Sequence, residues 1–293
     1  MQLRLQNPFT TNIMRKIFYF LCLGISLFQL SSCKKDPIET PPIAPVVFAE
    51  PNTPDGMVKI GTSYINGANA KAYIYSYNSL FVGYNQLFIA LYDSTTGKRI
   101  NKGSLNCLAL KHTGSIEKAC PKEVQKNTID SNSLYPINFI FDEASTDSTS
   151  WDLNFNFYQT PNNSYSGKLA ITVNSTNEPR VLHFKSIVDS QAYVIAYIPP
   201  VKVKVGLNDA EFIIHQENSN YSFTAAENLT TVIVLSMPAM GHGSPNNVSP
   251  VHTQNGHYMG KTNFTMSGLW KIQLKIYKNG ILLSDQVIFD YTI

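Results

Sequence analysis

Residues 270–280 read "WKIQLKIYKNG", and this stretch decides the fold class. From Trp270 to Ile276, apolar residues alternate with lysine and glutamine, which is the period of a strand with one buried face. The dipeptide Asn279-Gly280 that follows is typical of a tight turn between antiparallel strands. A last segment, "QVIFDYTI" (286–293), completes a predicted hairpin.

Strand patterns of the same kind occur throughout the chain after residue 56, and a helical period is almost absent. They lie at 71–77, 87–93, 135–141, 151–158, 168–173, 192–198, 201–206, 211–216 and 231–237. Short strands at this spacing predict an all-β protein built from β-sandwiches.

The two halves of this region resemble each other. Trp151 and Trp270 each open an alternating strand, and "VGYN" (82–85) corresponds to "VGLN" (205–208). Such matches at corresponding places indicate a tandem repeat. We therefore predict two β-sandwich domains in tandem.

Between these landmarks, "CLALKH" (107–112) falls where "MPAMGH" (237–242) does. This alignment places Cys107 with Met237, Leu110 with Met240, and His112 with His242. We take "NSTNEPR" (174–180) as the boundary, so the first domain is expected at 57–175 and the second at 181–293.

The N-terminus predicts a bacterial lipoprotein signal peptide over residues 1–32. A short basic start, Met14-Arg15-Lys16, precedes the apolar run 17–30, and the run ends in Leu30-Ser31-Ser32-Cys33. The run is of signal-peptide length and too short to span a bilayer comfortably. We expect cleavage before Cys33 and lipidation of this cysteine; the alternative is an ordinary signal peptide with an incidental cysteine.

Residues 33–56 are rich in proline and are expected to form an extended linker. Two acyl groups on Cys33 would anchor the protein to the membrane by themselves. The sequence "CKKD" (33–36) is similar to signals that send lipoproteins to the outer membrane. We therefore expect a lipid-anchored protein of the cell envelope, on the periplasmic or outer face of the outer membrane rather than at the inner membrane.

The mature chain is neutral. Of 23 basic residues, Arg4, Arg15 and Lys16 precede Cys33, and no acidic residue does, so removal of the leader leaves as many basic residues as the 20 acidic ones. A neutral chain without a basic stripe has no electrostatic footprint for nucleic acid. Nucleic acid is therefore not expected as a partner.

Two cysteines remain after the leader and Cys33 are set aside. Cys107 and Cys120 lie 13 residues apart in a protein expected in an oxidising compartment, so a disulfide is the default expectation. A thiolate metal pair is the alternative, but the spacing is not that of a CxxC site.

The segment 237–266 concentrates methionine and histidine. Of the 7 Met and 6 His residues in the chain, it holds Met237, Met240, Met259, Met266, His242, His252 and His257. Thioether sulfur is soft and favours Cu(I), whereas imidazole also suits Cu(II) and zinc. The segment therefore predicts a copper site for Cu(I), Cu(II) or both.

Spacing supports such a site. Pro238 and Gly241 end the preceding strand, so Met240 and His242 are expected on a constrained loop at the end of a sheet. His257 and Met259 are two residues apart and point to one face of an extended segment. Two such pairs facing each other would supply four ligands.

Other interpretations of these residues are open. Met266 shares its face with Phe264 and serves equally as a core residue, and Met237 could cap the core. His252 and His257 could each be exposed loop residues.

The sequences "MPAMGHGSP" (237–245) and "GHYMGKTNFTMSGLWKIQLKI" (256–276) resemble the YtkA-like family, which is close to the FixH-like proteins. The resemblance covers about 181–293. It implies immunoglobulin-like β-sandwiches in the bacterial envelope, associated with copper handling and terminal-oxidase assembly. The residues that match the motif are Met237, Met240, His242 and Met266.

The first domain departs from this motif. Leu110 and Cys107 replace two sulfur-bearing methionines of the alignment, and Asp142-Glu143 stand near the place of Met266. The resemblance thus implies a degenerate first copy that has kept the sandwich and lost the metal.

Two functions of different classes follow. The first is a membrane-anchored copper-binding lipoprotein, acting as a chaperone, a scavenger or an accessory to oxidase assembly, with a copper-receiving envelope protein such as a terminal oxidase as partner. The alternative is an immunoglobulin-like structural or adhesion lipoprotein that binds a protein or glycan without metal. An enzyme is not expected, because the sequence has neither a phosphate loop nor a nucleophile elbow.

Overall fold

The computed structural model describes residues 49–123 and 128–293. The predicted signal peptide (1–32), Cys33 and most of the predicted linker lie outside these residues. Strands dominate the described part, where the helical content is the three-residue 3₁₀ turn η1 (Pro238–Met240). The prediction of an all-β fold is therefore confirmed.

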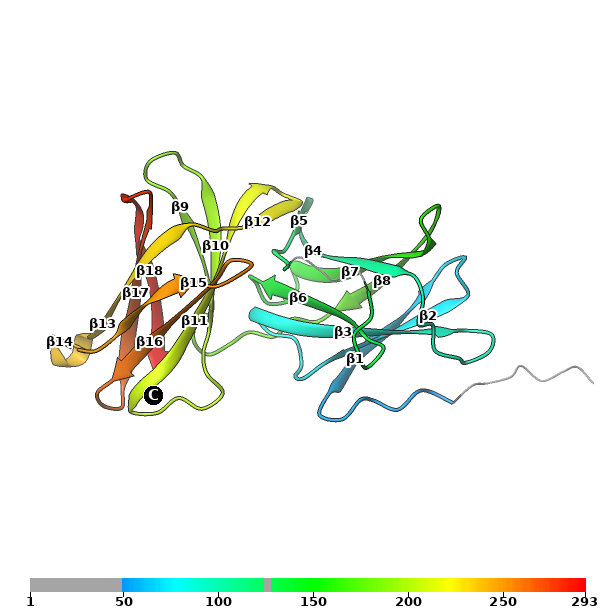
Figure 1. Cartoon of the computed structure of the whole chain (residues 1–293), viewed down its shortest axis with the longest axis horizontal. Coiled ribbons are helices and arrows are strands. Elements are labelled where there is room, and N and C mark those ends of the chain that lie inside the picture. The colour runs from blue at the N-terminus through cyan, green and yellow to red at the C-terminus, as the bar shows by residue number, and fades with distance from the viewer. Residues whose placement is uncertain (1–48, 124–127) are drawn as a thin grey trace, which may run out of the picture. The chain divides into compact units, whose positions relative to one another are not determined.

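The first sandwich is formed by eight antiparallel strands. They are β1 (Val58–Ile65), β2 (Ala70–Ser76), β3 (Gly83–Asp93), β4 (Ser104–Thr113), β5 (Ile116–Ala119), β6 (Tyr135–Phe141), β7 (Thr149–Thr160) and β8 (Asn163–Ile171). One sheet has the order β1-β2-β3-β6 and the other has the order β5-β4-β7-β8. These strands run from blue to green in Figure 1.

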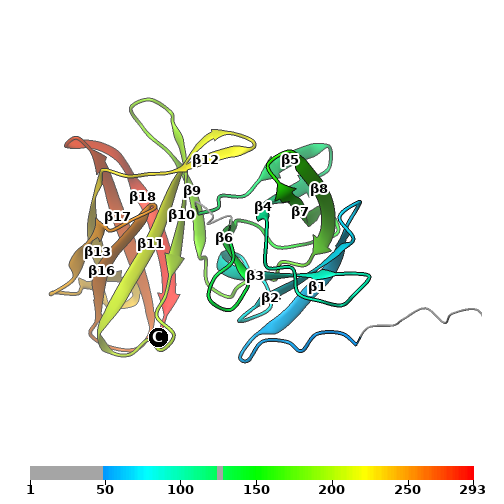
Figure 2. The same cartoon turned by 45° about the vertical axis from the view of Figure 1, so that its right-hand side comes forward.

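The second sandwich contains the remaining strands. They are β9 (Val181–Lys185), β10 (Ala192–Ile198), β11 (Gly206–Ser219), β12 (Ser222–Ala225), β13 (Leu229–Met237), β14 (His242–Gly243), β15 (Val248–His252), β16 (His257–Phe264), β17 (Leu269–Lys278) and β18 (Ile281–Thr292). One sheet has the order β15-β16-β11-β10-β9, with β12 paired to β11, and the other has the order β14-β13-β17-β18. Figure 2 shows these two sheets from a second direction, from yellow-green to red.

The second sandwich repeats the strand order of the first. The order β9-β10-β11-β16 corresponds to β1-β2-β3-β6, and β14-β13-β17-β18 corresponds to β5-β4-β7-β8. The second sandwich adds β12 and β15 to this shared plan. Corresponding residues can therefore be identified from strand register rather than from sequence spacing.

Each sandwich encloses its own apolar core. Trp151 and Phe155 lie in the first core, and Trp270 and Phe212 lie in the second, each with at most 1% of its surface exposed. Along β17 the alternate residues from Trp270 to Ile276 are all buried, as the alternation predicts. Burial of each large apolar side chain contributes roughly 1.5–3 kcal/mol, so these faces fix how the sheets pack.

The repeated "VG-x-N" motif closes the same loop in both sandwiches. The side-chain amide of Asn85 donates hydrogen bonds to the carbonyls of Phe81 and Gly83 and accepts one from the Phe81 N–H. Asn208 makes the same three bonds with Lys204 and Gly206. The glycine of each motif has positive φ, which favours a residue without a Cβ atom.

Cys107 and Cys120 both belong to the first core. Cys107 lies on β4 and Cys120 follows β5, with 1% and 2% of their surfaces exposed. The Cys120 N–H donates to the carbonyl of Ala109, which shares the inward face of β4 with Cys107. Both side chains therefore pack into the first core beside β4, and the bridge between them stays a prediction.

No helix within residues 49–123 and 128–293 has the length and apolar character needed to cross a membrane.

Candidate metal-binding end of the second sandwich

A tight turn brings His242 beside Met237. Met237 is the last residue of β13 and is 7% exposed. The η1 turn follows, and Gly241, with φ of 66°, returns its N–H to the carbonyls of Met237 and Pro238. His242 then pairs with Met237 across the hairpin. Residues directly opposite on paired strands share a face, so both side chains lie toward the inner side of the sandwich.

The loop between β16 and β17 brings Met266 to the same end. The indole N–H of Trp270 donates to the Met266 carbonyl over 3.0 Å. The Met237 methyl group packs so closely against Gly268 that a Cβ atom there would collide with it. The His242 ring lies 5.9 Å from the Trp270 ring in an edge-on arrangement. We call Met237, Met240, His242 and Met266 the Met/His end.

The hydrogen bond of His242 fixes its tautomer. Its Nδ1 atom lies 2.9 Å from the carbonyl oxygen of Gly243, which can only accept. Nδ1 therefore carries the proton of the neutral ring, and the lone pair is on Nε2. A ring oriented in this way by its second nitrogen is typical of metal-binding histidines.

The donor set at this end is neutral and partly open to solvent. Met240 and Met266 are 59% and 37% exposed, and Met237 is buried. Among the described residues, no group of three or more His, Cys, Asp or Glu side chains is placed to hold a metal. An ion bound here would thus depend on thioethers with one imidazole, a set that suits Cu(I).

His257 and Met259 lie elsewhere. Both are on β16, where Tyr258 between them is buried in the core, so their side chains point to the outer face of the other sheet. Met259 is 46% exposed and pairs with Glu211. The two facing pairs expected from the sequence are therefore not brought together. His252, on β15, packs its ring against Tyr258.

His257 is held by two carboxylates instead. Its Nδ1 lies 2.7 Å from Glu211, and its Nε2 lies 2.6 Å from Glu123 of the first sandwich. Burial disfavours the charged ring, but the carboxylates outweigh burial and raise the pKa of His257 to about 9. Tyr84 also donates to Glu123. Because both ring nitrogens contact carboxylates, His257 connects the two sandwiches and is not part of the Met/His end.

A second histidine at this junction was not expected from the sequence. His215 on β11 is 1% exposed, and burial lowers its pKa to about 4. It shares the outer face of its sheet with Ile213, which packs with Ile140 of the first sandwich. The apolar character of "EFIIHQ" (211–216) on both faces was the signal that this strand is covered on both sides.

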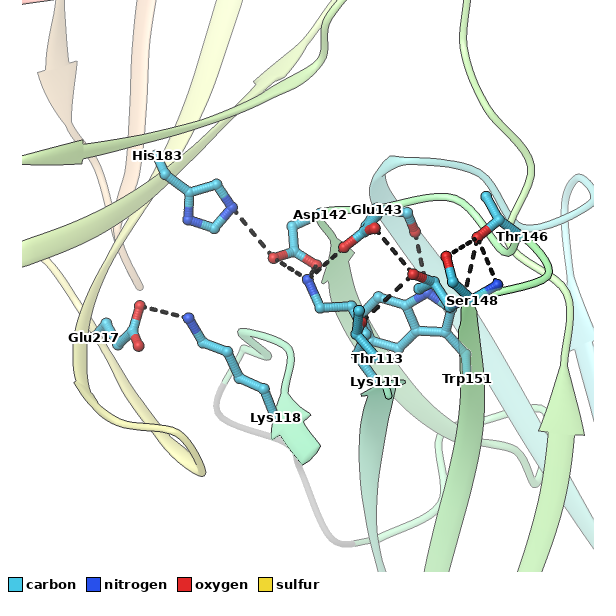
Figure 3. Close-up of polar contacts among 11 residues, drawn as sticks. Lys111, Thr113, Lys118, Asp142, Glu143, Thr146, Ser148, Trp151, His183 and Glu217 are labelled. Carbon is cyan, nitrogen blue, oxygen red and sulfur yellow. Dashed lines mark hydrogen bonds and ion pairs between the residues drawn. The ribbon is translucent and has the colours of Figure 1, made fainter. Parts of the chain in front are cut away.

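The corresponding end of the first sandwich carries an ion pair (Figure 3). Lys111 lies opposite Trp151. Its Nζ atom is 3.0 Å from Asp142, 3.1 Å from Glu143 and 5.8 Å from the Trp151 ring centroid. The Trp151 indole N–H donates to the Glu143 carbonyl over 3.0 Å, as Trp270 does to Met266. Asp142 also contacts His183 of the second sandwich.

Strand register corrects the alignment of the two copies. Ser236 pairs with Lys271, so Met237 lies opposite Trp270 and corresponds to Lys111. The hairpin partners of these residues are His242 and Lys118. The sequence had instead placed Cys107 with Met237, Leu110 with Met240, and His112 with His242. The alignment from the sequence is therefore four residues out of register with the strands.

His112 and Cys107 therefore have other surroundings. His112 lies between Glu117 and Asp152, with 2.7 Å from its Nε2 to Asp152. Cys107 pairs with Phe155, four residues after Trp151, as Ile233 pairs with Leu274, four residues after Trp270. Cys107 is thus the equivalent of a core residue.

Residues 188–275 match the YtkA-like family. The matched range contains the whole Met/His end and the Trp270 ring. It belongs to the second sandwich alone. Among curated proteins, no relative matches the chain.

Proposed function

Because residues 188–275 match the YtkA-like family, we propose that the protein is a membrane-anchored, extracytoplasmic copper-binding accessory protein. In this proposal the second sandwich binds copper, and the chain acts as a copper chaperone or scavenger or in oxidase assembly, without catalysis of its own. A family match of this kind is consistent with an extracytoplasmic accessory protein. The partner would be an envelope protein that receives copper, such as a terminal oxidase.

The observation that carries the proposal is that three segments bearing Met or His side chains meet at one end of one sandwich. Met237 ends β13, His242 returns beside it, and Met266 enters from the β16–β17 loop. In this tautomer of His242 the Nε2 atom is unprotonated, and its lone pair can bind a metal ion. A bound copper ion would supply a redox-active centre, and the chain's own contribution is to hold it in a neutral, thioether-rich setting.

The anchor is the second part of the proposal. Lipid on Cys33 would hold the protein at the envelope membrane, where two acyl chains give stable attachment. Expression of the full chain with a labelled fatty acid tests this, with Cys33→Ala as the control. Label on the wild type and none on the variant is expected; label on neither would overturn the anchor and leave the metal site unaffected.

The metal proposal is tested on the mature chain purified from cells grown with added copper. Copper content is measured, and the apo protein is titrated with Cu(I) against a competing chelator under reducing conditions. One tightly bound Cu(I) per chain is expected. A protein that neither retains copper nor binds Cu(I) would leave the structural or adhesion lipoprotein as the function.

A further inference from the structure

The residue opposite the tryptophan, Trp151 or Trp270, differs in charge between the two sandwiches. In the first, the Lys111 ammonium stands 5.8 Å from the centroid of the Trp151 ring. In the second, the same register position is Met237, opposite Trp270. A cation thus lies over the ring in one copy, and a neutral thioether takes its place in the other.

We propose that Trp270 is itself a contact residue for a monovalent cation at the Met/His end, with its indole face toward the ion. This inference rests on the proposed copper function and deepens it, because it states the charge of the ion and adds an aromatic ring to its surroundings. In the first sandwich the cation beside the tryptophan is the Lys111 side chain. In the second, under this proposal, the cation beside Trp270 is a bound metal ion.

The reach of the two side chains supports this placement. The sulfur of methionine is its δ atom, and the lysine nitrogen lies two bonds beyond its own δ carbon, a span of about 2.5 Å. A bond from sulfur to a metal is about 2.3 Å, taking zinc–thiolate as the guide. An ion bound to Met237 would therefore lie about as far from the backbone as the ammonium of Lys111 does.

The neighbouring charges support a single positive charge. In the first sandwich, Asp142 and Glu143 compensate the ammonium. Phe141 and Phe264 occupy equivalent places, opposite Gly83 and Gly206. The residues after Phe264 are Thr265 and Met266, so no carboxylate takes the place of either acid.

A neutral setting disfavours a divalent ion more than a monovalent one, because burying charge without a partner is costly. The face of tryptophan attracts cations and is the strongest of the aromatic rings in this respect. Soft thioethers, one imidazole and an indole face together favour Cu(I) and its redox-inert analogue Ag(I).

The test uses the mature full chain, in which Trp151 and Trp270 are the 2 tryptophans. Trp151→Phe leaves Trp270 as the reporter, and Trp270→Phe leaves Trp151. One equivalent of Ag(I) should remove most of the emission of Trp151→Phe and leave that of Trp270→Phe unchanged. Trp270→Phe should also bind Ag(I) about fivefold more weakly. Zn²⁺ serves as the charge control and should not change the emission of either variant.

Two outcomes overturn the inference in distinguishable ways. Binding of one Ag(I), established by equilibrium dialysis, without a change in Trp270 emission would remove the tryptophan contact and leave the copper site. Absence of Ag(I) and Cu(I) binding by the wild type would remove both. If Trp151→Phe does not fold, the difference between the wild type and Trp270→Phe gives the same measurement.

Discussion

The Nε2 atom of His257 lies 2.6 Å from a carboxylate oxygen of Glu123, although 134 residues separate them in the sequence. Burial opposes the charge of Glu123, but hydrogen bonds from His257, Asn138 and Tyr84 lower its pKa to about 2. The pKa of His257 is raised to about 9. The pair is therefore an imidazolium and a carboxylate across a wide range of pH, and it joins β16 to the segment after β5.

This pair predicts a loss of stability at alkaline pH. The folded pKa of His257 is above the ordinary value of 6.5, so its contribution is complete below about 6.5 and is lost as pH rises through 9. The contribution of Glu123 is complete above 4.5 and is lost as pH falls toward 2. Allowing for partial solvent screening, the His257 contribution is about 2 kcal/mol.

Urea unfolding of the wild type and His257→Gln at pH 6 and pH 10 measures it. The free energies of unfolding should differ by about 2 kcal/mol at pH 6 and should converge at pH 10. A difference that is the same at both pH values would show that the ring acts by packing and not by its charge.

Met240→Leu should weaken Cu(I) binding by about tenfold or more. Substitution of residues that only support a metal's ligands lowers metal affinity about 10–100-fold, and loss of a ligand should cost at least as much. The side chain is 59% exposed, so the free energy of unfolding should change by less than about 0.5 kcal/mol. Met259→Leu is the matched control, since it removes an exposed thioether from the outer face of β16. Chelator competition compares the three proteins; equal losses in both variants would place the ion away from the Met/His end.

Asn208→Ala should destabilise the second sandwich by about 1–3 kcal/mol, because three backbone groups lose their partners. Asn85→Ala should have the same effect in the first sandwich. Asn218→Ala is the control, since its side chain makes exposed contacts and should cost less than about 0.5 kcal/mol. Denaturant unfolding measures all three, and an Asn208→Ala protein as stable as Asn218→Ala would contradict the loop-closing role.

Cys107 and Cys120 should be bridged in the exported protein, which would add about 3 kcal/mol to the free energy of unfolding in the chain-entropy model. Thiols must be counted after denaturation without reductant, because burial raises the pKa of a Cys107 thiol to about 12 and blocks its reaction in the folded state. No reactive thiol from these two residues is expected. Two reactive thiols per chain would contradict the bridge.

The strands could be predicted from the sequence because alternation along a chain directly reflects one buried face. The repeat was visible because its landmarks make the same bonds in both copies: Asn85 and Asn208 close a loop, and Trp151 and Trp270 hold a carbonyl. The two copies have the same residue type at each of these positions, so the residues could be matched without relying on spacing.

The correspondence inside the repeat could not be predicted, because turn lengths differ between the hairpins. Spacing alone matched His112 to His242, whereas register matches Lys111 to Met237. The pairing of His257 with Met259 on one face was correct as local geometry. The sequence could not show which face of the sheet carries them, because that depends on Tyr258 entering the core. It also could not show that the partner of His257 lies in the other sandwich.

The charge difference between Lys111 and Met237 has a consequence for how the chain folds. Because the two sandwiches have the same strand order, a hairpin of one could pair with the strands of the other during folding. Such exchange between repeats is a characteristic misfolding route. If β4 paired with β17, Lys111 would be buried beside Trp270 without Asp142 or Glu143. If β13 paired with β7, those carboxylates would lose their ammonium. Each exchange strands a charge at the end of a core, which costs several kcal/mol, so the divergence of the two copies protects the correct pairing during folding.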